Sequence, residues 1–176
     1  MTLLFKQKEM TFQEIKQLLI LEFGEEIESE EKGLQPYLIV PVGKISEICQ
    51  FLFEDKRLYF DYLACITAID NGPGIATMEL IYNMTSIPYG LDLMIKTIFP
   101  RNTPDQPLPS VATVSHIWKT ADWHEREAFD LMGIHFENHP DLRRILLPED
   151  WEGHPLRRDY HAQEKYHGIN VRYGND

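Results

Sequence analysis

Histidine and arginine, the side chains of this sequence best suited to chemistry, gather in the last third of the chain. All seven histidines lie after residue 115, and six of the eight arginines lie after residue 120. Histidine suggests proton transfer or metal binding, whereas arginine suggests ion pairs and the recognition of carboxylates. The last third is therefore the candidate functional part of the chain.

The spacing of the histidines does not match a known metal or enzyme site. A zinc-protease helix carries a second histidine four residues after the first, and His124 has no such partner. His135 and His139 are four residues apart, but Pro140 disfavours one helix that presents both. No serine or cysteine stands in a nucleophile motif. We therefore predict no catalytic, cofactor-binding or metal-binding residue, with a stand-alone metalloenzyme that uses these histidines as the alternative.

A helix over residues 122–132 is predicted to point one carboxylate inward. Asp122 is a capping residue, and Gly133 ends the pattern. On a helical wheel at about 100° per residue, Glu125 falls among the apolar residues, while Arg126 and Asp130 fall on the opposite, polar side. An unpaired buried charge costs several kcal/mol, so Glu125 needs a partner. The downstream arginines could supply that partner, although a solvated charged face and pairing of Arg126 with Asp130 along the helix stay open.

Local patterns in the first hundred residues predict two helices that help to position this part of the chain. Thr11 and Glu14 have the spacing of a capping box, and Gly24 ends the helix that follows. A second amphipathic helix has apolar residues at positions i, i+3, i+4 and i+7, which are Ile45, Ile48, Cys49 and Leu52.

Apolar runs separated by glycine and proline predict the strands of a sheet. The short connections favour an antiparallel meander with the two helices on one face, which is an α+β fold followed by a helix and an irregular, arginine-rich C-terminal segment. We predict an edge strand over residues 37–42, strands over 58–69, 77–84 and 91–96, an acidic loop or weak edge strand over 25–32, and a short helix over 110–119.

Length and composition limit the class of protein. A chain of 176 residues suits one continuous domain, with an α+β scaffold over 1–120, a helix, loops and an extended tail over 121–176, and a proline-rich seam at 100–109. The net charge of −11 disfavours nucleic acid as a partner. No apolar run reaches the roughly 20 residues of a membrane span, and the first residues have no signal-peptide pattern. Cys49 and Cys65 lie in apolar segments, which disfavours a disulfide or an iron–sulfur cluster in this chain.

Three segments of the last third resemble one protein family. Residues 125–134 (EREAFDLMGI), 139–146 (HPDLRRIL) and 151–160 (WEGHPLRRDY) are similar to the signature of the C subunit of respiratory complex I, which mitochondrial naming calls the thirty-kilodalton subunit. The similarity is dense over residues 118–160 and looser over 11–100. Ala128 and Met132 depart from the family pattern, which affects local packing only.

The resemblance implies a non-catalytic subunit in the peripheral arm of a proton-translocating NADH:quinone oxidoreductase. Such subunits bind no cofactor themselves, whereas the parent complex uses NADH, FMN, iron–sulfur clusters and quinone. They dock on the D subunit, the forty-nine-kilodalton type, near the B and I subunits, at the cytoplasmic side of the bacterial inner membrane. They reach the membrane only through the complex. A homologous subunit of a membrane-bound hydrogenase or a related complex is the alternative within the family.

The resemblance and the charge pattern together predict a set of structural and partner-interface residues. We expect the carboxylates and arginines of this set to form an ion-pair node that joins the helix to the following loops or to the partner. The set comprises Glu125, Arg126, Glu127, Asp130, His139, Arg143, Arg144, Arg157, Arg158 and Asp159.

Overall fold

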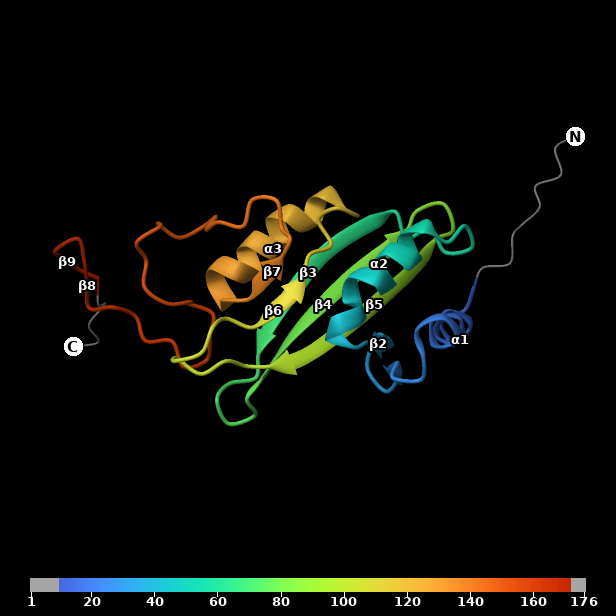
Figure 1. Ribbon diagram of the computed structural model, residues 1–176, viewed down its shortest axis with the longest axis horizontal. Helices are drawn as coiled ribbons and strands as arrows, with labels where there is room; N and C mark the ends of the chain where they lie inside the picture. Colours follow the sequence, from blue (N-terminus) through green and yellow to red (C-terminus); the bar gives the residue numbers. More distant parts are fainter. Residues whose placement is uncertain (1–9, 172–176) are drawn as a thin grey trace, which may run out of the picture.

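A computed structural model describes residues 10–171 of the chain (Figure 1). The start of the chain, where no signal-peptide pattern was expected, and the last five residues of the predicted tail lie outside this range. The elements are α1 (Phe12–Phe23), β1 (Glu28–Glu30), β2 (Tyr37–Ile39), η1 (Val42–Lys44), α2 (Ile45–Glu54), β3 (Tyr62–Asp70), β4 (Thr77–Ser86), β5 (Leu91–Pro100), β6 (Ser110–Ala112), α3 (Lys119–Met132), β7 (His135–Glu137), β8 (Lys165–Tyr166) and β9 (Ile169–Asn170).

The main sheet has five strands in the order β1-β2-β5-β4-β3. Strands β3, β4 and β5 form the predicted antiparallel meander, but β2 pairs with β5 in parallel, so the sheet is mixed. The prediction of β2 as an edge strand was wrong, because β1 pairs with its free side. The acidic β1 is itself the edge strand, and its charged residues disfavour pairing with another chain.

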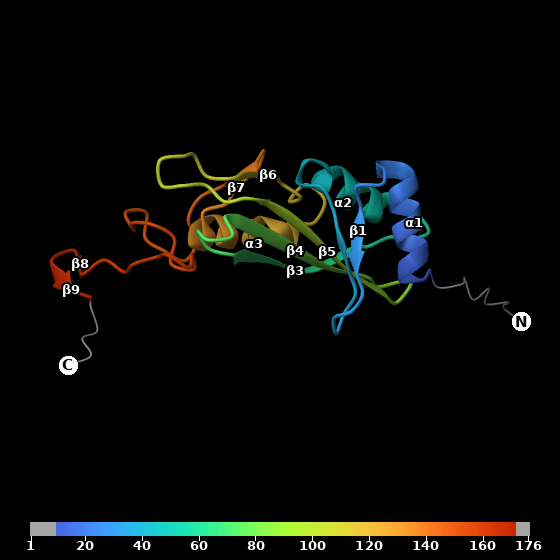
Figure 2. The ribbon, with the colours of Figure 1, turned by 90° about the horizontal axis from the view of Figure 1, so that it is seen from below.

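One face of the meander builds the hydrophobic core. Met78, Leu80, Tyr82 and Met84 alternate with less buried residues along β4, as a half-covered strand requires. Buried residues of α1 and α2 belong to the same core. Both helices lie on the same side of the sheet, and none of the helices in residues 10–171 covers its opposite face (Figure 2). The predicted α+β class is confirmed.

Helix α1 begins and ends where its local signals predict. Thr11 and Glu14 make both hydrogen bonds of the capping box. Gly24 follows the last turn, and its N–H donates to Ile20 O at 2.9 Å.

The predicted short helix over residues 110–119 was wrong. Residues Ser110–Ala112 form β6, which pairs in parallel with β7, so that Ser110 lies opposite His135 and Val111 opposite Phe136. The pairing buries Val111 and Phe136. Because the partner strand lies far along the chain, local periodicity does not reveal this strand.

Helix α3 lies beside β3, and the following residues pass around it (Figure 1). The helix begins at Lys119, three residues before the predicted cap Asp122, and ends at Gly133 as predicted. Residues 138–160 contain no helix or strand and are called the C-terminal segment below. Residues 161–171, part of the predicted extended tail, include the short hairpin β8–β9. The ring of Tyr166 in this hairpin packs against the ring of Trp151, with the ring centroids 5.4 Å apart.

Candidate interaction site

Asp130 of α3 anchors the middle of the C-terminal segment. Its fully buried carboxylate accepts backbone N–H groups from Ile145, Leu146 and Leu147 at 3.1, 2.8 and 2.9 Å, and pairs with Arg144 Nη1 at 2.7 Å. Burial opposes ionisation, but the hydrogen bonds outweigh it, so the pKa of Asp130 lies below its usual value. The segment is therefore bound to the helix through an ionised carboxylate.

Asp70, at the end of β3, anchors the last part of the same segment. Its carboxylate accepts the N–H groups of Gly72 and Arg158 at 3.0 and 2.9 Å, and Arg101 Nε at 2.8 Å. Burial again opposes ionisation, but the N–H groups of Arg158 and Gly72 and the guanidinium of Arg101 lower the pKa of Asp70. Arg101 also pairs with Asp159. The end of the sheet and residues 158–159 are thus joined by one ionic network.

Glu125 is buried, as the wheel predicted, but its partners differ from those expected. Its carboxylate accepts Val114 N–H at 2.7 Å and the Thr113 hydroxyl, and His139 Nε2 lies 3.8 Å away. No arginine in the described part of the chain lies within 4.0 Å of this carboxylate. Burial raises the pKa of Glu125 to about 7 against the effect of these hydrogen bonds. The carboxylate therefore joins α3 to the residues after β6 without a fixed counter-ion.

His139 joins the first turns of α3 to the C-terminal segment. Its side chain is fully buried. Nδ1 accepts the N–H of Asp141 at 3.0 Å, and Nε2 lies 3.1 Å from the carbonyl oxygen of Asp122. Because Nδ1 accepts a hydrogen bond, it carries no proton, and Nε2–H donates to the carbonyl. This pattern is a structural role for the imidazole.

Arg126 binds backbone carbonyls instead of a carboxylate. Nε and Nη2 donate to the carbonyl oxygens of Arg143 and Arg144 at 3.3 and 3.2 Å, and the guanidinium lies over the Trp123 ring. Arg126 and Asp130 do not lie on a solvated charged face, the alternative left open for this side of the helix, because the C-terminal segment covers it. Each has partners in that segment, so the structure does not pair the two along the helix.

The C-terminal end of α3 is closed by cationic and imidazole groups. Arg157 donates from Nε to Met132 O at 2.8 Å and from Nη2 to Gly133 O at 3.0 Å. His154 Nδ1 lies 2.9 Å from Asp130 O. The last carbonyls of a helix lack partners within the helix, and positive charge is favourable there. These side chains therefore satisfy the helix end and hold residues 154–157 against it.

The predicted residues divide into a buried and an exposed group. The structure buries Glu125, Arg126, Asp130 and the side chain of His139, and partly buries Arg144 and Arg157. The exposed group comprises Glu127, Arg143, Arg158 and Asp159.

Sequence reasoning missed Asp70, Arg101, Thr113 and His154 as members of the site. Asp70 directly follows the strand predicted over residues 58–69, and Arg101 falls within the range of the proline-rich seam. An aspartate immediately before Asn71-Gly72 has the pattern of a side chain that binds backbone N–H groups, and it could have been found from that signal. Its contact with Arg158, 88 positions away, had no local signal.

Exposed apolar and cationic side chains lie on the surface that these contacts hold in place. Trp123 is 61% exposed, Leu146 62% and Leu156 59%. The Arg143 side chain is 69% exposed, and its one ion pair within residues 10–171 is with the exposed Asp141, at 3.0 Å. Tryptophan and arginine are the residues that most often dominate protein–protein contacts. The arrangement suits binding of another protein.

Residues 10–171 offer neither a cluster of metal ligands nor a membrane-spanning helix. This part of the chain contains no group of three or more histidine, cysteine, aspartate or glutamate residues placed to hold a metal ion. None of its helices is both long enough and apolar enough to cross a membrane.

The raised pKa of Glu125 predicts a stability that falls as the pH rises towards neutrality. Between its usual pKa of 4.5 and its folded pKa of about 7, the folded state keeps a proton that the unfolded state releases. Deprotonation of this group should lower the free energy of unfolding by roughly 2–3 kcal/mol between pH 5 and pH 8. His154, whose pKa is lowered by burial, changes stability in the opposite sense over the acidic part of this range.

Urea unfolding of the full chain and of Glu125→Gln over this pH range measures the effect. The difference in unfolding free energy between wild type and variant isolates Glu125, because His154 contributes to both. We expect the wild type to lose roughly 2–3 kcal/mol relative to the variant as the pH rises from 5 to 8. A difference that stays constant with pH would contradict the assignment.

Comparison with known proteins places residues 38–166 within one family model, described as "Respiratory-chain NADH dehydrogenase, 30 Kd subunit". The chain is 44% identical over 168 residues to the C subunit of NADH-quinone oxidoreductase from Chloroherpeton thalassium, covering 94% of this chain and 65% of that protein. It is 38% identical over 170 residues to the subunit of the same name from Chlorobium phaeobacteroides, covering 92% of this chain and 99% of that protein. The chain thus spans just under two thirds of the first relative and nearly all of the second.

A solved structure shares the fold. A chain of the archaeal membrane-bound sulfane sulfur reductase, a respiratory membrane complex, superposes with a TM-score of 0.68 at 26% identity, and the match covers 85% of each chain.

Proposed function

Because the chain belongs to the family of the 30 kDa subunit, also called the C subunit, of respiratory NADH-quinone oxidoreductase, we propose that it is a non-catalytic peripheral-arm subunit that docks on the D subunit and supports the quinone-reducing module. NADH, FMN, iron–sulfur clusters and quinone bind to other subunits in this proposal. The complex is a proton-translocating one, and this protein lies on the cytoplasmic side of the bacterial inner membrane without inserting into it.

One observation carries the proposal. Two buried carboxylates, those of Asp70 and Asp130, bind backbone N–H groups of the C-terminal segment and hold this irregular stretch of chain in one conformation. A surface that is ordered before binding loses little conformational entropy when it meets a partner. The irregular stretch presents Arg143 and Leu146 outward, which supports a role in assembly.

The two parts of the chain have different roles in this proposal. Residues 1–120 act as the scaffold, and residues 121–176 act as the part that contacts partner subunits, with the B and I subunits as further neighbours. The hairpin β8–β9 extends this surface away from the sheet (Figure 1).

A related complex is the second candidate. The similarity to a chain of the membrane-bound sulfane sulfur reductase supports a homologous subunit that serves a different electron donor. The electron donor that drives the purified complex separates the two candidates, because only the first requires oxidation of NADH.

Mild solubilisation of native membranes, followed by pull-down of the tagged chain, tests the proposed function. We expect co-recovery of a D-subunit homologue together with NADH:quinone activity. Recovery of the chain alone would contradict the proposal, and stoichiometric zinc or iron in that isolated chain would favour a metalloenzyme.

Arg143 provides a separate test of the proposed interface. Arg143→Ala should reduce co-recovery of the D subunit more than Lys119→Ala, because loss of the arginine leaves a desolvated partner group without its counter-charge. The unfolding free energy of the isolated chain should change by less than about 0.5 kcal/mol, since the Arg143–Asp141 pair is exposed. Equal co-recovery of the two variants would show that Arg143 lies outside the interface.

A further inference from the structure

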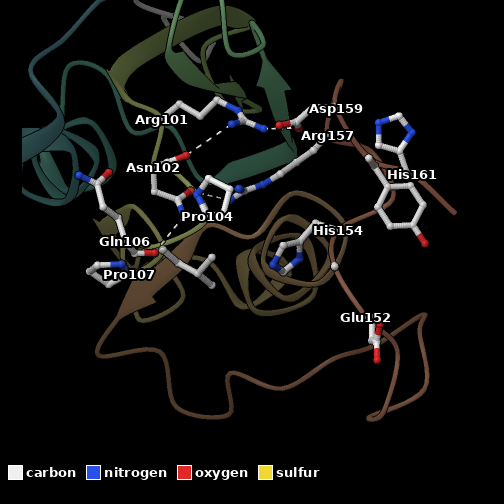
Figure 3. Close-up of a pocket in the computed structure, with 13 residues that line it drawn as sticks. Arg101, Asn102, Pro104, Gln106, Pro107, Glu152, His154, Arg157, Asp159 and His161 are labelled. Atoms are coloured by element: carbon white, nitrogen blue, oxygen red, sulfur yellow. Dashed lines mark hydrogen bonds and ion pairs between the residues drawn. The ribbon is translucent and has the colours of Figure 1, made fainter. Parts of the chain in front are cut away.

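A cavity of about 610 Å³ lies where the end of β5, the proline-rich seam (residues 100–109) and the C-terminal segment meet (Figure 3). Arg101 and Asn102 line it from the end of β5, and His154 and Arg157 line it from the C-terminal segment. Its walls therefore come from parts of the chain that are far apart in the sequence, joined by the Asp70 network.

Arg157 has no carboxylate partner in the described residues. Its three hydrogen bonds go to neutral oxygens: Met132 O, Gly133 O and Asn102 Oδ1, the last at 2.9 Å. Its Nη1 makes no hydrogen bond among these residues and is not among the buried polar atoms that lack a partner. This nitrogen is therefore available to a group that enters the cavity.

The electrostatic state of Arg157 favours a carboxylate as that group. Burial and the positive charge of Arg101 lower the pKa of Arg157, against the attraction of Asp70 and Asp159. Both of these carboxylates already bind Arg101 directly, and neither lies within 4.0 Å of Arg157. A partly desolvated guanidinium without a direct counter-ion gains most from a carboxylate that brings its own charge.

We propose that the cavity receives an extended segment of the partner protein and that a carboxylate of this segment binds Nη1 of Arg157. The proposal rests on the function proposed above, in which the chain docks on another subunit, and it names the chemistry of one contact. Pro104, Pro107 and Leu108 line the same cavity and provide an apolar wall for the aliphatic part of an aspartate or glutamate side chain. Prolines also keep this wall stiff, which reduces the entropy lost on binding.

Arg157 itself is a poor site for the test, because it also binds the end of α3. Gln106 lines the cavity, and its Oε1 accepts the N–H of Thr103 at 3.1 Å. Gln106→Glu keeps this acceptor and adds a negative charge to the lining of the cavity. Gln17→Glu, on the exposed side of α1, makes the same chemical change far from the cavity and is the matched control.

The test compares how much partner protein is co-recovered with each tagged full-length variant over a series of salt concentrations. We expect Gln106→Glu to weaken apparent affinity about tenfold, because like charges oppose each other within the cavity, while Gln106→Lys and Gln17→Glu retain co-recovery. The unfolding midpoint of each isolated chain should match that of the wild type, which excludes loss of the fold. Normal co-recovery with Gln106→Glu would overturn the proposal.

A photo-crosslinking residue in place of Glu152, an exposed residue of the same cavity, identifies the occupant. The crosslinked peptide should come from the partner protein and contain aspartate, glutamate or a terminal carboxylate. The same probe in place of the exposed Leu21 of α1 should not capture that peptide. Capture of residues of this chain itself, or no capture within an assembled complex, would overturn the proposal. Failure of the wild-type chain to co-recover any partner would instead contradict the proposed function.

Discussion

Replacement of Asp130 by asparagine should release the middle of the C-terminal segment and lower the free energy of unfolding by about 3–5 kcal/mol. One oxygen of Asp130 accepts three backbone N–H groups, and the other binds Arg144. An asparagine amide must place its NH₂ group against one of these two sets of donors. The variant therefore loses hydrogen bonds and leaves the partly buried Arg144 without its counter-charge.

Urea unfolding of the full chain measures the loss of stability, and amide hydrogen exchange locates it. We expect the N–H groups of residues 145–147 to exchange faster than in the wild type, while the strands of the main sheet keep their protection. Asp141→Asn is the matched control, because this carboxylate lies in the same segment but is exposed, so its replacement should leave the free energy of unfolding nearly unchanged. Unchanged exchange at residues 145–147 would show that Asp130 does not anchor the segment. In the assembled state, we expect Asp130→Asn to prevent co-recovery of the partner protein.

Gly133→Ala should lower the free energy of unfolding by about 3–4 kcal/mol and displace residues 153–158 from the end of α3. Gly133 has a φ of +66°, a conformation that costs other residues about 1–2 kcal/mol. A methyl group at this position would also lie 2.5 Å from two ring atoms of His154 and 2.8 Å from Nη2 of Arg157. The imidazole and the guanidinium would have to move, and their hydrogen bonds to the helix end would break.

The variant Gly90→Ala separates the cost of backbone strain from the cost of the steric clash. Gly90 has a φ of +63°, almost the same as that of Gly133, but no atom lies within 4 Å of an added methyl group. Gly90→Ala should lower the free energy of unfolding by about 1–2 kcal/mol through backbone strain alone. Removal of the imidazole in the double variant Gly133→Ala, His154→Ala should restore part of the packing loss, which a double-mutant cycle measures. Equal costs for Gly133→Ala and Gly90→Ala would rule out the predicted clash.

The elements that could be predicted are those whose signals lie within one or two turns of chain. The capping box at Thr11, the apolar spacing that starts at Ile45 and the left-handed ending at Gly133 all depend on neighbouring residues, and the structure confirms each of them. The inward position of Glu125 follows from the apolar residues around it on the same helix.

The burial of Arg126 and Asp130 could not be read from the same wheel. A wheel assumes that polar residues face water, but an irregular segment from farther along the chain covers this side of α3. That segment has no periodicity, because its conformation is set by the carboxylates that bind its N–H groups. The partners of Glu125 were missed for a related reason: Thr113 and Val114 follow a strand that was predicted to be a helix.

The α+β class, both ends of the first helix and, through a dense motif, membership of the family of this respiratory-chain subunit could be established from the amino-acid sequence alone. Such features depend on local hydrogen bonds, apolar periodicity and residue identity, all of which are present in the linear chain. Which charged residues act as anchors, and which stay exposed to meet a partner, depends on contacts between segments that lie far apart in the chain. The same kinds of residue serve both purposes, and long-range contacts alone separate the buried Asp130 from the exposed Arg143.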